Sequence, residues 1–223
     1  SLDLNLNEKV DYIFTDPPYG EAIQYSELSF MWNAWLEKEY ANEEEVIINP
    51  VQGKGPEEFN NLLTQSLVEM NKYLKEDGYF TLCFQNKDYK IWEEVIQSCK
   101  ELGLSLENIH IYDTFGSPFN KHWAKFSPKA DIYVTFKKQP ADKEKYFDKP
   151  TDLETIIKSV LDYMEKSSPE IDIIKLYDVT VSLLIWNLYY NQSKIKIEKF
   201  NIQSFGKIVD ELLDKKEPEV SMV

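Results

Sequence analysis

The protein has 223 residues, enough for one large domain or for an ordinary domain with an additional segment, and enough to build a hydrophobic core. It carries 25 basic residues against 39 acidic ones, a formal net charge of −14, and every basic residue is a lysine. Phosphate-binding proteins depend on clustered positive charge and base readout favours arginine, so the composition argues against a general nucleic-acid clamp.

The cysteines and the apolar runs indicate the cellular compartment in which the protein is expected. Cys83 and Cys99 lie in apolar segments and are predicted to be free thiols in a reducing environment. No run approaches 18 apolar residues, and the first ten residues lack the basic and apolar regions of a signal peptide. We therefore expect a soluble, cytoplasmic protein without membrane contact. The Ser-Leu start, without an initiator Met, leads us to expect that the chain is part of a longer protein.

Apolar runs and helical periodicity alternate along the first 138 residues. The run at 10–15 predicts a buried strand that stops at the sequence DPPYG, residues 16–20, here named the Asp16–Gly20 turn. Within a helix predicted at 26–40, Trp32 and Trp35 lie one turn apart and are expected in the core. Further helices are predicted at 57–75 and 88–102, and further strands at 79–84, near 108–115 and at 131–137.

This order predicts an α/β fold whose central strands are parallel and whose last two strands form an antiparallel pair. Residues 1–140 form the predicted α/β domain, and a polar, proline-flanked linker follows at 141–150. The remainder, 151–223, is predicted to be helical, with helices at 153–164, 171–190 and 205–213.

The Asp16–Gly20 turn follows the carboxyl end of a predicted strand, which is where open α/β sheets bind ligands. Such residues suit methyl transfer to an exocyclic amine, a poor nucleophile because its nitrogen lone pair is delocalised into the base. The Asp16 carboxylate and the Pro17 carbonyl would accept the two N–H groups and localise that lone pair. Pro17 and Pro18 stiffen the turn. Tyr19 offers a ring face for an extruded base, and Gly20 permits close backbone approach.

The sequence TDPPYG after an apolar strand resembles the catalytic motif of S-adenosylmethionine-dependent, amino-methylating DNA methyltransferases, chiefly of the adenine N6 type. Residues 49–88 are similar to the region after that motif in site-specific DNA methylases, and 128–138 resemble their last, antiparallel strand. The resemblance covers about residues 8–138. It implies the C-terminal half of a Rossmann-like methyltransferase sheet, S-adenosyl-L-methionine as cofactor, DNA as substrate, and a place in restriction–modification.

Members of this family bind the cofactor on a glycine-rich turn that resembles Phe-x-Gly-x-Gly. The seven glycines here do not form that pattern. The segment most like it contains Gly116, but Pro118 stands where the second glycine should be. We therefore expect the cofactor half upstream of Ser1, with Asp16 the one residue here that contacts the cofactor, and an isolated chain that is inactive. The sheet edge beside residues 10–15 is then expected to be exposed, and to pair with the missing N-terminal half or with a second copy.

A loop at 119–129 interleaves aromatic residues with lysines. Residues 120–138 contain five lysines and one acid, whereas residues 1–100 contain eight lysines and 19 acids. Lys121, His122 and Trp123 are therefore candidate substrate-binding residues that hold an unstacked base and its phosphate. A solvated loop with Trp123 tucked into the core is an equally open interpretation. His122 has no Cys or His neighbour at ligand spacing, so no metal site is predicted.

Three further segments allow more than one interpretation. Gln85-Asn86-Lys87 comes directly after the strand predicted at 79–84, and it either lines the pocket beside Asp16 or caps the next helix. Gly53-Lys54-Gly55 is interpreted as a connector rather than a phosphate-binding loop, because no strand leads into it. His110, on an apolar strand, is expected to be a satisfied core residue.

The sequence thus supports several hypotheses. The first is a DNA adenine methyltransferase fragment, most of whose DNA affinity lies outside this chain. Methylation of cytosine N4 or of RNA is the alternative within the same chemistry. The third is a non-catalytic module whose C-terminal helices dock another subunit.

Overall fold

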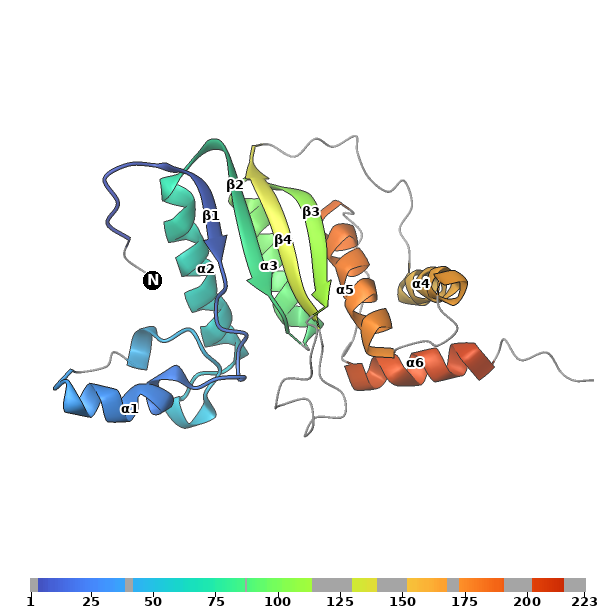
Figure 1. Ribbon diagram of the computed structural model, residues 1–223, viewed down its shortest axis with the longest axis horizontal. Helices are drawn as coiled ribbons and strands as arrows, with labels where there is room; N and C mark the ends of the chain where they lie inside the picture. The colour runs from blue at the N-terminus through green and yellow to red at the C-terminus, as the bar shows by residue number, and fades with distance from the viewer. Residues whose placement is uncertain are drawn as a thin grey trace, which may run out of the picture. The chain divides into compact units, whose positions relative to one another are not determined.

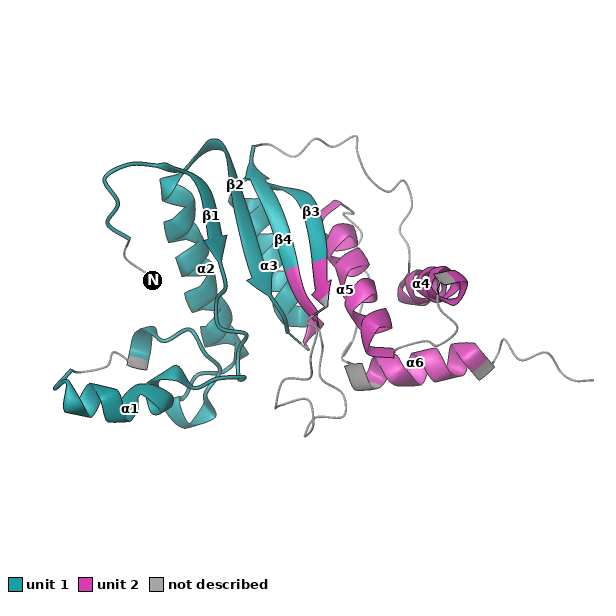
Figure 2. Cartoon of the chain, in the orientation of Figure 1, with its two compact units in different colours: residues 1–86, 90–110, 133–142 teal, residues 87–89, 111–132, 143–223 magenta. Residues whose placement is uncertain are grey.

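The computed structural model describes residues 4–38, 42–86, 88–113, 130–139, 152–167, 173–190 and 202–214. The chain forms two compact units (Figure 2). The first comprises residues 1–86, 90–110 and 133–142, and the second comprises 87–89, 111–132 and 143–223. The linker predicted at 141–150 lies outside the described residues.

The first unit is built on a four-stranded sheet in the order β1-β2-β4-β3 (Figure 1). The strands are β1 (Val10–Thr15), β2 (Leu74–Phe84), β3 (Leu104–Asp113) and β4 (Ala130–Lys138). β1 and β2 are parallel, with Tyr12 opposite Tyr79 and Phe14 opposite Thr81. β4 runs against both of its neighbours (Figure 1). The α/β class, the parallel strands and the antiparallel pair are therefore confirmed.

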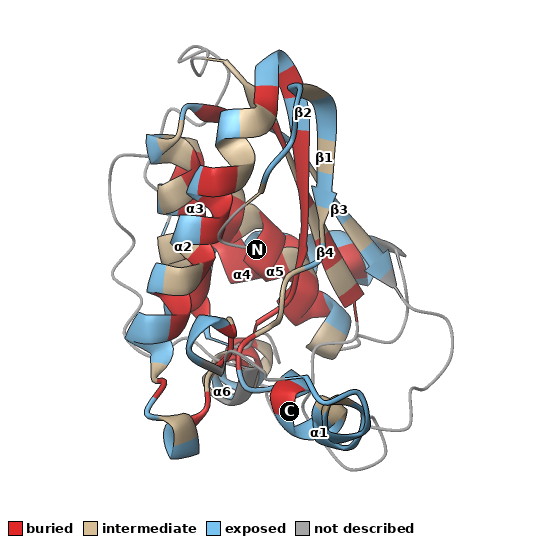
Figure 3. Ribbon diagram, turned by 90° about the vertical axis from the view of Figure 1, so that its left-hand side faces the viewer, coloured by how far each residue is buried: buried red, intermediate tan, exposed pale blue. Residues whose placement is uncertain are grey.

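Helices α2 (Pro56–Tyr73) and α3 (Tyr89–Glu101) lie on one face of this sheet (Figures 1 and 3). Thr64 of α2 and Ser98 of α3 approach to 3.0 Å through their hydroxyl oxygens. The core between the helices and the strands is apolar, and burial of that surface is the main term that holds the unit together. Its members include Phe59, Leu63, Leu67, Phe80, Leu82, Phe84, Trp92, Val95, Ile96, Val134 and Phe136.

β1 lies at the edge of the sheet among the described strands, as expected, but it is not buried. Tyr12 and Phe14 are 53% and 54% exposed. The prediction of a buried strand was wrong because β1 has a single neighbouring strand and because these two side chains project from a face that α2 and α3 do not cover. Self-association through this edge stays a prediction.

The helix predicted at 57–75 ends two residues early, and the Asp77-Gly78 pair after it lies in a strand. α2 ends at Tyr73 and β2 begins at the next residue. Asp77 has a φ of 63° within the strand, and the register with β1 shifts there. A Cβ at Gly78 would lie 2.8 Å from the Leu74 side chain, so glycine is required. The pair therefore forms an irregularity inside β2, which extends the strand by five residues beyond the prediction.

Helix α1 (Tyr25–Trp35) is shorter than predicted and exposes its apolar side chains. Trp32 and Trp35 are 63% and 71% exposed and contact each other edge to face, with 5.5 Å between ring centroids. The expectation that both lie in the core was wrong. Periodicity shows that a helix has an apolar face, but no described element covers this one.

His110 is likewise exposed, not buried, and its ring Nε2 lies 2.9 Å from the Asn108 side-chain amide. β3 alternates apolar and polar residues around this position, and residues 108 and 110 are both exposed.

The second unit contains α4 (Leu153–Ser167), α5 (Ile173–Tyr190) and α6 (Ile202–Asp214), which contact one another. Tyr177 of α5 and Phe205 of α6 meet edge to face at 5.4 Å. All three predicted helices are confirmed, with small differences at their ends. None of the described helices combines the length and apolar character that crossing a membrane requires.

Both cysteines are free and buried, as expected. Burial raises the pKa of Cys99 to about 12, so its reactive thiolate is scarce in the folded protein at neutral pH. We predict that a thiol reagent such as 5,5′-dithiobis(2-nitrobenzoate) at pH 8 leaves Cys99 unmodified in the native chain and modifies it within minutes in 6 M guanidinium, measured by peptide mass spectrometry. Rapid native modification of Cys99 would contradict its burial.

Candidate functional site

The Asp16–Gly20 turn follows the carboxyl end of β1, beside the carboxyl end of the parallel strand β2. Asp16 is exposed, Pro17, Pro18 and Tyr19 are half-buried, and Gly20 is buried. Because carboxyl ends of parallel strands meet at one edge of a sheet, residues that follow β2 reach the turn. The turn thus exposes the Asp16 carboxylate to solvent, while the other end of the turn, at Gly20, is buried.

Tyr19 packs against the end of β2. Its hydroxyl lies 3.3 Å from Cys83 Sγ, and its ring meets Phe84 edge to face with centroids 5.6 Å apart. Burial raises the pKa of Tyr19 far above its ordinary range, and hydrogen bonds with Cys83 and Asp16 raise the pKa further. The phenol therefore stays protonated at neutral pH and can donate a hydrogen bond.

Asn86, which follows β2, binds the backbone of the Asp16–Gly20 turn. Its side-chain Nδ2 donates to the Tyr19 carbonyl at 2.8 Å, and its own carbonyl accepts from Trp92 Nε1 at 3.3 Å. Gln85 Oε1 accepts from the Asn86 backbone N–H at 2.9 Å, and both side chains are more than nine-tenths buried. Of the two interpretations open from the sequence, the structure places Asn86 beside the turn. Lys87 lies outside the described residues.

Gly20 is required where it stands. Its φ is +101°, which L side chains rarely adopt, and a Cβ there would lie 3.2 Å from both Asn86 Nδ2 and Ile48 Cδ1. Its carbonyl accepts from the Ile48 backbone N–H at 3.2 Å. Gly20 therefore joins the turn to the segment around Ile48 by close backbone approach, as the sequence indicated.

A second polar network begins one residue further along, at Asn49. This side chain is 4% exposed, and its Nδ2 donates to Gln24 Oε1 at 2.8 Å and to Glu27 Oε1 at 3.0 Å. Its Oδ1 accepts from the backbone N–H groups of Val51 and Gln52. Asn49 thus fixes the start of α1 to the short 3₁₀ helix Pro50–Gln52.

Lys54 is part of the same network, and its ammonium group is bonded within the protein. Its Nζ donates to the Glu45 carbonyl at 2.6 Å, and burial lowers its pKa. Glu45 Oε1 in turn accepts from the Ser26 backbone N–H at 2.9 Å. The side chain therefore crosslinks chain segments, which agrees with the interpretation of 53–55 as a connector.

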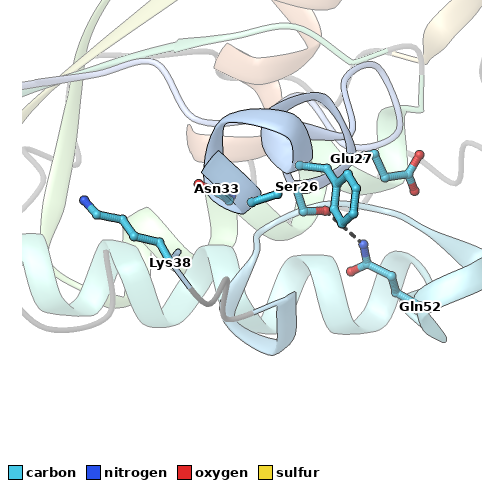
Figure 4. A pocket seen from close by; sticks show the side chains of 7 residues that line it. Ser26, Glu27, Asn33, Lys38 and Gln52 are labelled. Atoms are coloured by element: carbon cyan, nitrogen blue, oxygen red, sulfur yellow. Dashed lines mark hydrogen bonds between the residues drawn. The ribbon is translucent and has the colours of Figure 1, made fainter. Parts of the chain in front are cut away.

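A pocket of about 600 Å³ opens between α1 and the Pro50–Gln52 helix, and we name it the α1 pocket (Figure 4). Sequence reasoning missed it, since the residues come from two segments whose proximity depends on Asn49. Its lining residues are Ser26, Glu27, Phe30, Asn33, Ala34, Lys38 and Gln52.

Lys121, His122 and Trp123, predicted to bind the substrate, lie outside the described residues. Within the described part of the chain, no three His, Cys, Asp or Glu side chains gather in a way that would hold a metal ion.

No known protein family matches the sequence, and no curated protein is significantly similar to it. Among solved structures, the chain is similar to one described as "crystal structure of M1.HpyAVI-SAM complex", with 16% identity, coverage of 92% of this chain and 90% of that one, and a TM-score of 0.31. It is also similar to the PvuII DNA methyltransferase (cytosine-N4-specific), with 11% identity, coverage of 97% and 90%, and a TM-score of 0.34. Likeness of this extent does not establish a family or an activity.

Proposed function

We propose that this chain carries the substrate side of an S-adenosylmethionine-dependent amino-methyltransferase that acts on adenine N6 in DNA. The observation that carries the proposal is the Asp16–Gly20 turn itself. It combines an exposed carboxylate, two prolines and an aromatic ring at the carboxyl end of a strand, and the neighbouring strand fixes it through Asn86.

The residues of the turn act on the amine nitrogen. The Asp16 carboxylate and the Pro17 carbonyl accept the two N–H groups of the base and favour a pyramidal nitrogen with a localised lone pair. Pro18 has no N–H, so it cannot donate within the turn, and the ring restricts its φ. Asp16 is also the described group placed to take the proton that the nitrogen loses.

Tyr19 has two proposed roles. Its protonated phenol orients the Asp16 carboxylate, which is one of the two groups, with Cys83, whose proximity raises the pKa of Tyr19. Its ring is half-buried, so the part that Phe84 does not contact is the surface on which the target base would rest. Gly20 keeps the backbone beneath that base close to Asn86.

S-adenosylmethionine supplies the methyl group in this proposal, and the described residues do not include the glycine-rich turn that would hold most of it. Among the described residues, the glycines with positive φ are Gly20, Gly53 and Gly103. Gly20 lies between β1 and α1 but belongs to the proline-containing Asp16–Gly20 turn, and the other two do not follow a strand. Asp16 is therefore the one residue here that we assign to the cofactor. The glycine-rich turn is expected from residues outside this sequence.

The test is transfer of labelled methyl groups by the complete protein that contains this chain. S-adenosyl-[methyl-³H]methionine is supplied with duplex DNA, single-stranded DNA or RNA, and the product is digested to nucleosides. We expect label in N6-methyladenine from DNA. Label in N4-methylcytosine, or in RNA alone, would contradict the proposed substrate but support transfer of a methyl group to an amine. The absence of label from all three nucleic acids would contradict the proposed methyltransferase activity.

A further inference from the structure

Helix α1 turns its polar face toward the protein and its apolar face toward solvent, which is the reverse of an ordinary surface helix. Its three least exposed residues are Ser26, Ser29 and Asn33. Ser26 joins the helix to the rest of the unit, because its backbone N–H donates to Glu45 Oε1 at 2.9 Å and its hydroxyl accepts from Gln52 Nε2 at 3.2 Å. The contact of α1 with the described part of its own chain is therefore largely polar.

Large apolar side chains form a stripe along the outer face of α1, and we name it the α1 stripe. They follow one another at the i, i+3, i+4, i+7, i+8 spacing that places residues on one side of a helix, and each is between 59% and 71% exposed (Figure 3). The stripe consists of Leu28, Met31, Trp32, Trp35 and Leu36. Contiguous exposed apolar surface with a polar rim is typical of interaction sites, so we infer that the stripe contacts another molecule.

Acidic residues lie at both ends of the stripe. Residues 21–45 contain seven acids and one lysine. Glu27 lies in the first turn of α1 and Glu37 follows its carboxyl end, and both are exposed. The short helix Asn42–Glu44 carries two more exposed glutamates, and Glu45 attaches it to the start of α1. Charge complementarity therefore favours a partner with basic side chains beside its apolar surface.

The same charge argues against three other occupants. A second copy of this chain would bring the same acids and another net charge of −14 to the contact. Helices that lie on membranes carry Lys and Arg on their polar face, since the cytoplasmic leaflet is negative. Nucleic acid requires positive charge for its phosphates. A basic protein segment remains as the occupant that matches both the apolar stripe and its rim.

We propose that the α1 stripe docks a basic amphipathic helix of a partner protein. Its apolar residues, spaced i, i+3, i+4 and i+7, pack against the stripe, and its Lys or Arg residues face Glu27 and Glu37. Trp32 and Trp35 are the anchors, because tryptophan is enriched among the residues that dominate binding energy. α1 has 11 residues and is roughly 16 Å long, so three turns of a partner helix match it. This inference is independent of the proposed function, since Asp16 lies outside the stripe.

The experiment measures binding of two fluorescein-labelled helical peptides to the complete protein by fluorescence anisotropy. The first, LKKLLKLLKKLLKL, has a basic rim, and the second, LEELLELLEELLEL, has the same apolar positions with an acidic rim. We expect the basic peptide to bind on the order of tenfold more tightly, with a preference that shrinks as NaCl rises from about 50 mM to about 500 mM. Equal affinity for the two peptides, or no binding of either, would overturn the proposal.

A variant of the stripe distinguishes docking from general attraction between opposite charges. Replacing Trp32 and Trp35 together by alanine should weaken the basic peptide by about thirtyfold, the loss typical of an interface anchor, and should leave the fold intact because both side chains are exposed. Tyr163→Ala is the matched control, since Tyr163 is 70% exposed on α4 in the other unit. Unchanged binding by the tryptophan variant, or an equal loss in Tyr163→Ala, would place the peptide elsewhere and contradict docking on α1.

A second pair of variants tests the acidic rim. Glu37→Gln combined with Glu44→Gln should weaken the basic peptide and leave the acidic peptide no weaker than before. Glu57→Gln combined with Asp210→Asn removes the same charge from exposed positions outside the rim and should bind both peptides as wild type. Equal weakening by the two double variants would show that net charge, not the rim of the stripe, attracts the peptide.

Two further measurements identify the other occupants. If the complete protein sediments as a dimer that the Trp32→Ala and Trp35→Ala substitutions dissociate, a second copy covers the stripe and the proposal is wrong. If it binds phosphatidylcholine vesicles and the same substitutions abolish that binding, the stripe is a membrane contact and the proposal is equally wrong. Asp16→Ala should bind the basic peptide as wild type does, so loss of methyl transfer and loss of docking are separate results.

Discussion

Replacing Asp16 by alanine is expected to reduce kcat for methyl transfer by about 10²–10⁴, the range typical of a lost general base or of a lost group that stabilises developing charge. The physical reason is that the carboxylate is the one charged acceptor in the turn, and without it the amine nitrogen keeps its lone pair delocalised. Single-turnover rates with saturating DNA and S-adenosylmethionine measure this step separately from binding. The affinity for DNA, measured by fluorescence anisotropy, should change little.

Asp11→Ala is the matched control for this substitution. Asp11 lies on the same strand, its side chain is 85% exposed, and it pairs with Lys75 at 2.8 Å on the surface. A surface ion pair contributes at most about 1 kcal/mol, so this variant should methylate DNA at the wild-type rate. Equal losses in Asp16→Ala and Asp11→Ala would show that general damage to β1, not lost chemistry, explains the effect. Retained methylation in Asp16→Ala would remove the catalytic role of the turn.

Local patterns predicted much of the first unit. Helices at 57–75 and 88–102 and strands at 79–84 and 131–137 correspond to observed elements, because hydrophobic periodicity and strand propensity are encoded within a few neighbouring residues. The site could be anticipated for the same reason, since the Asp16–Gly20 turn is one contiguous segment at a strand end. Its assigned chemistry remains a proposal.

The features that sequence reasoning missed depend on residues that are distant in the chain. The exposure of Trp32 and Phe14 could not be predicted, because an apolar side chain carries no information about whether another element covers it. The Asp77-Gly78 irregularity depends on the register between β1 and β2, not on the helix-stop signal that the pair also provides. The α1 pocket depends on Asn49, whose partners lie 22 and 25 residues away.

Asn86 is intermediate between these cases. Its link to Tyr19 spans 67 residues and has no local signature, but its place after the carboxyl end of β2 was a usable signal, because parallel strands bring their carboxyl ends together. That position made Asn86 a candidate without specifying which atom it would hold. The structure identifies the atom as the Tyr19 carbonyl.

The Asn86 contact leads to a prediction about positioning rather than direct chemistry. Asn86→Asp keeps the side-chain shape, but it removes the N–H donor and brings carboxylate oxygens toward the Tyr19 carbonyl. Loss of a hydrogen bond to a buried partner costs about 1–3 kcal/mol, so we expect kcat to fall roughly tenfold to a hundredfold as the turn loses its fixed geometry. The Kd for DNA should remain close to the wild-type value, because Asn86 is 9% exposed and supplies its amide to the protein itself.

Asn71→Asp distinguishes this role from ordinary stabilisation. Asn71 Nδ2 donates to the Leu102 carbonyl at 3.2 Å, so it makes the same amide-to-carbonyl bond between α2 and the end of α3, away from the turn. Both variants should lower the Tm, since both leave a carbonyl without its donor. If Asn86 positions the turn, only Asn86→Asp loses kcat when the two are compared well below their unfolding temperatures. A proportional loss of kcat in Asn71→Asp would mean that stability, not the geometry of Tyr19 and Asp16, limits the reaction.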